Sequence, residues 1–178
     1  MDVLVKNIDL LELPADALVY STNVLLNCTG GVGACLLERY GKQVQTDLHQ
    51  LLSDRGTRFA EQGAVFQHVT DGMPYKQVFH TVPCDGFYDT TEEIVKGILR
   101  YCLEQCSATE DIRTIAMSAL ATGYGRLLFD DFFRIASSIF TENNYPGIDT
   151  ITICVSNDYS YRLVIEQTTK EKLRVKLA

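Results

Sequence analysis

Short runs of apolar residues alternate along the chain with longer stretches in which apolar positions recur every three or four residues. The short runs are typical of β-strands and the longer stretches of amphipathic helices. Strands are predicted at residues 3–5, 17–21, 63–69, 77–82, 114–120 and 150–155, and helices at 33–40, 44–52, 90–103, 130–140 and 157–172. This alternation predicts an α/β fold, a three-layer α/β/α sandwich around a mixed, mostly parallel six-stranded sheet.

Local signals refine two of these elements. Thr90 is followed by Glu93 three residues later, which is the pattern of a capping box, so Thr90 is expected to cap its helix. The run at 150–155 is almost entirely apolar, as in a strand buried on both faces. No linker, repeat or change of composition interrupts the 178 residues, and we expect a single domain spanning 1–178.

The charge of the chain narrows the choice of ligand and location. The formal net charge is −7, so nonspecific nucleic-acid binding, which needs a basic face, is not expected. A bound phosphate would accordingly be held by backbone amides more than by lysines. No apolar run is long enough to span a membrane and the N-terminus does not resemble a signal peptide, so we expect a cytoplasmic protein without a membrane partner.

The six cysteines form no C-x-x-C pair, and reduced thiols are their expected state. Cys102 and Cys106 lie one helical turn apart, but no histidine or second cysteine pair accompanies them, so we expect neither a metal site nor a cofactor. Cys28 is either a nucleophile beside a glycine cluster or, as we favour, a small buried thiol. His68 and His80 lie within strand patterns, which favours packed or surface residues over a catalytic base.

Two glycine clusters give the strongest indication of function. Residues 29–33 (TGGVG) follow the strand at 17–21, residues 122–125 (TGYG) follow the strand at 114–120, and a helical pattern comes after each. A glycine turn between a strand and a helix exposes backbone N–H groups to an anion, which the helix dipole also favours. The same glycines would also suit the geometry of the turns alone. Two such loops indicate a ligand with a diphosphate in its middle.

The order and spacing of four segments resemble the macro domain family, whose members bind ADP-ribose. The segments are 8–10 (IDL), 16–23 (DALVYSTN), 29–32 (TGGV) and 117–125 (MSALATGYG). The corresponding family patterns are G-D-I, D-A-I-V-N-A-A-N, G-G-G-V and P-A-L-G-T-G-x-G. The resemblance covers nearly the whole chain and implies an ADP-ribose site at the carboxyl edge of the sheet, where α/β folds place their ligands.

The resemblance also implies roles for individual residues. Asp9 would accept a hydrogen bond from the adenine amino group, helped by the backbone of Leu10, and Asn23 would hold the distal ribose and is the tentative catalytic residue. Taken without the resemblance, Asp9 is an ordinary turn aspartate and Asn23 a turn or capping asparagine. The implied ligand-binding residues are Asp9, Leu10, Ser21, Asn23, Gly30, Gly31, Val32, Leu120, Ala121, Thr122, Gly123, Tyr124, Gly125 and Asn157.

Three positions depart from the family pattern in ways that bear on activity. Tyr20 replaces the first asparagine of N-A-A-N, and Thr29 replaces the first glycine of G-G-G. Gly33 stands where members that hydrolyse ADP-ribosyl esters commonly carry an acidic residue.

Three functions therefore remain open. The first is a module that binds ADP-ribose, free or on an ADP-ribosylated protein. The second is a hydrolase of mono-ADP-ribosyl-protein, O-acetyl-ADP-ribose or ADP-ribose 1″-phosphate, in which the ligand's own phosphate orients water near Asn23. The third is an interaction domain whose pocket has decayed and is obstructed by Tyr20 and Thr29.

Overall fold

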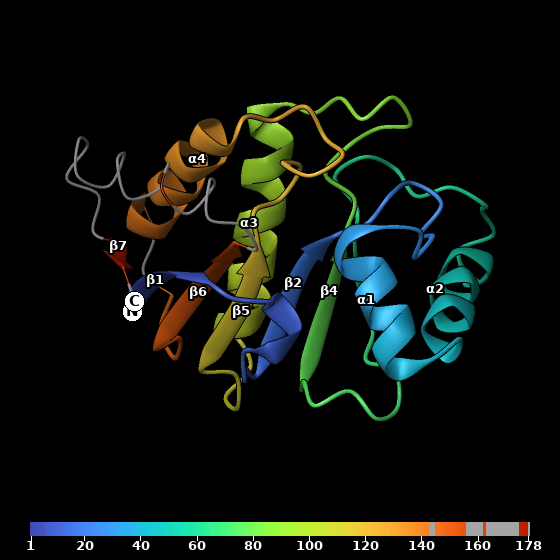
Figure 1. The fold of residues 1–178 in the computed structure, drawn as a ribbon, viewed down its shortest axis with the longest axis horizontal. Helices are drawn as coiled ribbons and strands as arrows, with labels where there is room; N and C mark the ends of the chain where they lie inside the picture. The colour runs from blue at the N-terminus through green and yellow to red at the C-terminus, as the bar shows by residue number, and fades with distance from the viewer. Residues whose placement is uncertain (143–144, 156–161, 163–174, 178) are drawn as a thin grey trace.

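In the computed structural model, which describes residues 1–142, 145–155, 162 and 175–177, the strands form a single sheet (Figure 1). The strands are β1 (Asp2–Asn7), β2 (Ala17–Ser21), β3 (Val65–Gln67), β4 (Gln77–Thr81), β5 (Thr114–Ser118), β6 (Thr150–Val155) and β7 (Val175–Leu177). Their order is β3-β4-β2-β5-β6-β1-β7, and β3 is antiparallel to β4 whereas every other described pair is parallel. The six predicted strands are present, and β7 adds a short edge strand beside β1.

Helices cover both faces of this sheet. They are the 3-10 helix η1 (Leu10–Glu12) and the α-helices α1 (Gly31–Tyr40), α2 (Gln43–Asp54), α3 (Glu92–Ser107) and α4 (Phe129–Glu142). One core cluster joins α3 and α4 to the sheet, and a second joins η1, α1 and α2 to it. The predicted three-layer α/β/α sandwich is confirmed.

β2 lies in the middle of the sheet and contributes to both clusters. Its side chains alternate, so that Ala17 and Val19 pack in the first cluster while Leu18 and Tyr20 pack in the second. All four are fully buried, as expected of a parallel strand covered on both faces. The carboxyl end of β2 is thereby fixed between those of β4 and β5, which places the loops after the three strands side by side.

Two sequence predictions differ from the structure. The N-cap of α3 is Thr91 and not Thr90: the Thr91 side chain accepts a hydrogen bond from the Ile94 N–H, while the Thr90 hydroxyl donates to the Pro83 carbonyl. The strand predicted at 63–69 is limited to Val65–Gln67. The helix predicted at 157–172 lies outside the described residues, apart from Arg162. No helix in the described part of the chain is long and apolar enough to cross a membrane.

Candidate functional site

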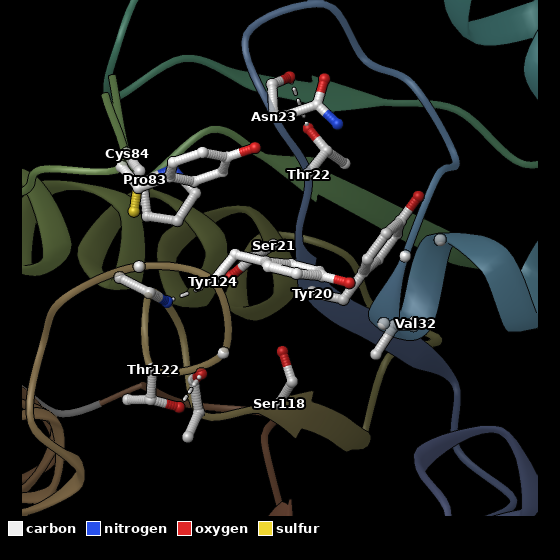
Figure 2. A pocket seen from close by; sticks show the side chains of 18 of the residues that line it. Tyr20, Ser21, Thr22, Asn23, Val32, Pro83, Cys84, Ser118, Thr122 and Tyr124 are labelled. Atoms are coloured by element: carbon white, nitrogen blue, oxygen red, sulfur yellow. Dashed lines mark hydrogen bonds between the residues drawn. The ribbon is translucent and has the colours of Figure 1, made fainter. Parts of the chain in front are cut away.

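A cavity of about 510 Å³ lies at the carboxyl edge of the sheet, a volume in the range of small-molecule sites. Three loops surround it: the β2–α1 loop (residues 22–30), the β4–α3 loop (82–91) and the β5–α4 loop (119–128). Cys154 and Val155, at the end of β6, line the end of the cavity that is farthest from β4. Figure 2 shows side chains from these loops converging on the same space. The location agrees with the site expected from the order of the strands.

Side-chain amides hold the β2–α1 loop. Asn23 Nδ2 donates to the Asn27 carbonyl (2.8 Å), and Asn23 Oδ1 accepts from the N–H groups of Leu25 and Asn27 (3.1 Å each). These bonds use the two lone pairs of the oxygen and one of the two N–H groups of the amide. In this structure Asn23 therefore acts as a turn asparagine, and a role toward ribose would fall to its remaining N–H.

Gln45 of α2 holds the same loop from the other side. Its Oε1 accepts from the Cys28 N–H (2.7 Å), and its Nε2 donates to the Leu26 carbonyl (2.9 Å). The loop leads directly into α1, whose first residues Gly31, Val32 and Gly33 line the cavity. Gly30 supplies no side-chain cap, so these first amide groups are open to an anion.

The β5–α4 loop takes its shape from close packing. A Cβ atom at Gly125 would overlap the Ala121 carbonyl and lie 2.7 Å from Cys84 Sγ, so only glycine fits there. The Thr122 hydroxyl donates to the Ala119 carbonyl (2.9 Å), and the Ala121 N–H donates to Ser21 Oγ (3.2 Å). α4 begins at Phe129, close to the start predicted at residue 130 and four residues beyond Gly125. Any anion contact here would come from loop amides without a helix dipole.

The β4–α3 loop borders the cavity on the side of β2 that faces away from β5. Asp85 Oδ1 accepts from the N–H groups of Phe87 and Asp89 (2.9 Å each), which forms a tight turn. Arg126 of the β5–α4 loop donates its backbone N–H to the Tyr88 carbonyl (3.3 Å) and its guanidinium to Asp89 (2.9 Å). These bonds tie the two loops together at the mouth of the cavity.

Backbone strain gathers around this cavity. Leu26, Tyr88 and Ala121 are the non-glycine residues with positive φ in the described part of the chain, at 52°, 67° and 63°. Each belongs to a different one of the three loops. Such conformations cost free energy and tend to occur at functional sites, so their distribution supports a binding role for this cavity.

Tyr20 forms part of the cavity wall. Its hydroxyl lies 2.6 Å from His80 Nδ1, and His80 Nε2 lies 3.0 Å from the His68 carbonyl. A carbonyl only accepts, so Nε2 carries the His80 proton and Nδ1 accepts from Tyr20. Burial lowers the pKa of His80 to about 4 and raises the pKa of Tyr20 well above its usual value. Both groups are therefore neutral, and the Tyr20 hydroxyl points at His80 instead of obstructing the cavity.

Three cysteines also line the cavity, and each is protonated at neutral pH. Burial raises the pKa of Cys28, and it raises the pKa of Cys84 to about 11 and that of Cys154 to about 12. Since the thiolate is the reactive form, this agrees with a packing role for Cys28.

Tyr124 extends from the β5–α4 loop across to the β2–α1 loop. A Cβ atom at Gly30 would lie 2.7 Å from both Cε2 and Oη of Tyr124. The centroid of its ring is 6.2 Å from that of Tyr88, and Tyr124 is 74% exposed. The ring therefore lies between the two glycine clusters (Figure 2).

The residues predicted from the sequence fall into three groups. Ser21, Asn23, Gly30, Gly31, Val32, Ala121, Thr122, Gly123, Tyr124 and Gly125 line the cavity. Asp9, Leu10 and Leu120 are not among its lining residues: Asp9 is exposed and caps η1 through Leu11 N–H (2.9 Å), and the other two are buried in the core. Asn157 lies outside the described residues.

Asp9 nevertheless stands close to one end of the cavity. β1 is paired with β6, and the Ile8 N–H donates to the Val155 carbonyl at 3.1 Å. The Asp9 charge also contributes to the raised pKa of Cys154. The end of the cavity at β6 is thus the end near Asp9, and the end at β4 is the opposite one.

The β4–α3 loop contributes residues that no sequence pattern indicated. Cys84, Asp85 and Tyr88 line the cavity but belong to no glycine pattern. The usable signal was the strand ending at Pro83, because a parallel strand beside β2 must end at the same edge of the sheet.

Comparison with known proteins agrees with this architecture. Residues 19–136 match the family model described as the Macro domain. A macro domain-containing protein of Streptomyces coelicolor is 28% identical over 131 residues, which cover 72% of this chain and 76% of that protein.

Solved structures show the same fold. The Oceanobacillus iheyensis macrodomain with ADP has a TM-score of 0.80 at 16% identity, covering 93% of this chain and 89% of that chain. The Trypanosoma brucei macrodomain in complex with ADP-ribose has a TM-score of 0.75 at 19% identity, covering 93% of this chain and 68% of that chain. Because the family model spans more than half of its length, the chain belongs to the macro domain family.

Proposed function

We propose that this chain binds ADP-ribose, free or linked to a protein, in the cavity at the carboxyl edge of the sheet. One observation carries the proposal: the open amide groups that begin α1, at Gly31, Val32 and Gly33, line the same cavity as the loop that contains Gly123. No basic side chain is among the described residues that line it. A diphosphate would therefore be held by backbone N–H groups from two sides.

The strand order supports one direction for the ligand. Asp9 lies beside the β6 end, where its carboxylate would accept from the adenine amino group, and Asn23 lies toward the β4 end, where the distal ribose would sit. That the solved macrodomain of Trypanosoma brucei is in complex with ADP-ribose supports the choice of ligand.

Calorimetry with ADP-ribose tests the diphosphate site. No atom lies within 4 Å of a Cβ built at Gly123, so both glutamate and glutamine can be accommodated there. Gly123→Glu should weaken binding by about tenfold or more through repulsion of the phosphates, and Gly123→Gln, of similar size, should weaken it less. Absence of binding by the wild type, or equal affinities of the two variants, would refute the proposal.

A second pair of measurements tests the adenine contact. Asp9→Asn keeps the Oδ1 acceptor that caps η1 at Leu11 but places an amide N–H₂ where the carboxylate would accept from adenine. We expect Asp9→Asn to bind ADP-ribose about fivefold more weakly, the loss of a modest hydrogen bond. The same substitution should leave the affinity for ribose 5-phosphate unchanged.

Hydrolysis of ADP-ribose derivatives is the second candidate. Asp85 favours it, because this carboxylate lines the cavity and can accept a proton from water. Against it, Gly33 supplies no carboxylate and the Asn23 amide is engaged in its own loop. Turnover of a mono-ADP-ribosylated protein, lost in both Asn23→Ala and Asp85→Asn, would establish the hydrolase. Tight binding of ADP-ribose without turnover would instead support a module that only binds the ligand.

The state of the cysteines supports the cytoplasmic location that we propose. All six are unpaired, as is usual in a reducing compartment.

A further inference from the structure

The charge of the cavity is uneven. Asp85 is the one ionisable carboxylate among the described residues that line it, and no lysine, arginine or histidine lines it there. Asp85 follows β4, whereas Cys154 and Val155 end β6, and β2 and β5 lie between these strands. The single charge therefore stands at the end of the cavity opposite to Asp9, close to the loop that carries Asn23.

The position of this charge is fixed by the turn. Asp85 Oδ1 accepts from the N–H groups of Phe87 and Asp89, both at 2.9 Å, so the carboxylate cannot swing into solvent without losing two hydrogen bonds. Arg126, a cation at the mouth of the cavity, is paired with Asp89 at 2.9 Å. Burial raises the pKa of Cys84, and the charges of Asp85 and Asp89 raise it further.

Large apolar side chains stand exposed on the two loops at this end, beside the Arg126–Asp89 ion pair. Phe87 and Leu128 are 78% and 68% exposed, and Tyr88 and Tyr124 stand beside them on the same two loops. Asp85 itself is half-buried, so solvent screens its charge less than that of an exposed carboxylate.

We propose that Asp85 makes the site selective for ADP-ribose whose distal ribose carries an uncharged substituent, and that it disfavours a phosphate at the 1″ position. The inference rests on the proposed function and on the ligand direction given there. A phosphate beyond the distal ribose would meet a fixed carboxylate, and no basic side chain is among the described residues that line the cavity. An ester or another neutral linkage would bring no like charge to the carboxylate, and a ribose hydroxyl that stays free would donate to it. Of the derivatives considered from the sequence, acylated and protein-linked ADP-ribose fit this end, and ADP-ribose 1″-phosphate does not.

The test compares the dissociation constants of ADP-ribose and ADP-ribose 1″-phosphate by calorimetry at low salt. For the wild type we expect the phosphate to bind at least about tenfold more weakly, because like charges repel strongly in a partly enclosed site. Asp85→Asn retains the oxygen that accepts from Phe87 and Asp89 and removes the charge. It should strengthen binding of both ligands, that of the phosphate more, so that the ratio of the two constants falls at least about fivefold.

Asp71→Asn is the matched control. Asp71 is exposed and lies in the segment that leads into β4, at the opposite edge of the sheet, so its removal changes the net charge equally without changing the ratio. Raising the salt concentration should also reduce the wild-type ratio, as expected of charge repulsion and not of a steric clash. Thermal unfolding of each variant establishes that it is folded.

The possible outcomes separate the two proposals. If the wild type binds ADP-ribose but shows no preference, or if the preference persists in Asp85→Asn, the selectivity proposal is overturned while the binding function stands. If the wild type binds neither ligand, the binding function itself fails. A ratio that falls equally in Asp71→Asn would show an effect of net charge and would also overturn the assignment to Asp85.

Discussion

The two glycine clusters resemble each other in sequence and differ in how their loops are built. The β2–α1 loop runs directly into α1, and the amides of Asn23 and Gln45 hold its backbone. The β5–α4 loop ends at Phe129, after the glycines, and close packing of Gly125 against Ala121 and Cys84 fixes its course. Side-chain amides bind the backbone of the first loop, whereas the second loop, besides its hydrogen bonds to Ser21 and within itself, has a position where only glycine fits.

The difference shows that similar glycine patterns can serve different physical purposes. The start of α1 offers an anion both amide groups and a helix dipole. The β5–α4 loop offers an anion its loop amides without a helix dipole. Glycines of the second cluster should therefore divide sharply into replaceable and irreplaceable positions. At the start of α1, the effect of replacing Gly30 should depend mainly on the Tyr124 ring that lies over it.

The largest expected effect is at Gly125. Gly125→Ala places a methyl group against the Ala121 carbonyl and 2.7 Å from Cys84 Sγ, so the loop must move. We expect a decrease in the free energy of unfolding of more than about 3 kcal/mol, at the upper end for overpacking, measured by urea denaturation. Gly123→Ala, which meets no atom within 4 Å, should change it by less than about 0.5 kcal/mol. Equal effects at the two positions would mean that the packing at Gly125 is not what shapes the loop.

The second prediction concerns the wall beneath the β2–α1 loop. Folding lowers the pKa of His80 from 6.5 to about 4 through burial, so the unfolded chain takes up a proton that the folded chain excludes. The resulting stabilisation is complete above the unfolded pKa and is lost as the pH falls from 6.5 toward 4. One pKa unit corresponds to about 1.4 kcal/mol, which gives a loss of about 3 kcal/mol over this window.

Urea denaturation at a series of pH values measures this loss. His80→Gln should flatten the curve between pH 6.5 and 4, while His49→Gln, at an exposed position of α2, should keep the wild-type slope. If both variants keep it, the acid sensitivity comes from groups other than the Tyr20–His80 pair. The buried Tyr20–His80 pair would then not distinguish the surroundings of the β2–α1 loop from those of the β5–α4 loop.

Much of the site's location could be predicted because parallel strands end at a common edge. Ser21 and Asn23 follow one predicted strand and Ala121 to Gly125 another, and pairing of β2 with β5 brings these segments together. The binding role of each residue stays a prediction. The sequence could not show that the Asn23 amide bonds its own loop, because bonds to Leu25 and Asn27 compete locally with any bond to a ligand.

Other features depended on contacts that no local pattern records. Thr90 and Thr91 are equally suitable caps, and the choice between them follows from a bond between Thr90 and the Pro83 carbonyl. The β4–α3 loop that carries Asp85 is likewise bonded to the β5–α4 loop by Arg126, which is distant in sequence. Tertiary contacts of this kind decide which of two threonines caps α3 and how the β4–α3 loop lies against the cavity.

The smallest expected effect is at Gly30, and it completes the comparison. A methyl group there would approach Tyr124 to 2.7 Å, but the φ of Gly30 is −173°, which any residue adopts, and the exposed Tyr124 ring can turn aside. Gly30→Ala should therefore cost about 1 kcal/mol, the expected penalty for alanine at an N-cap. In a Tyr124→Ala background the cost should be the same within about 0.5 kcal/mol, because the two residues then act independently. A larger coupling between the two substitutions would mean that the ring is held as firmly as Cys84 is at Gly125, and that both loops are shaped by what they exclude.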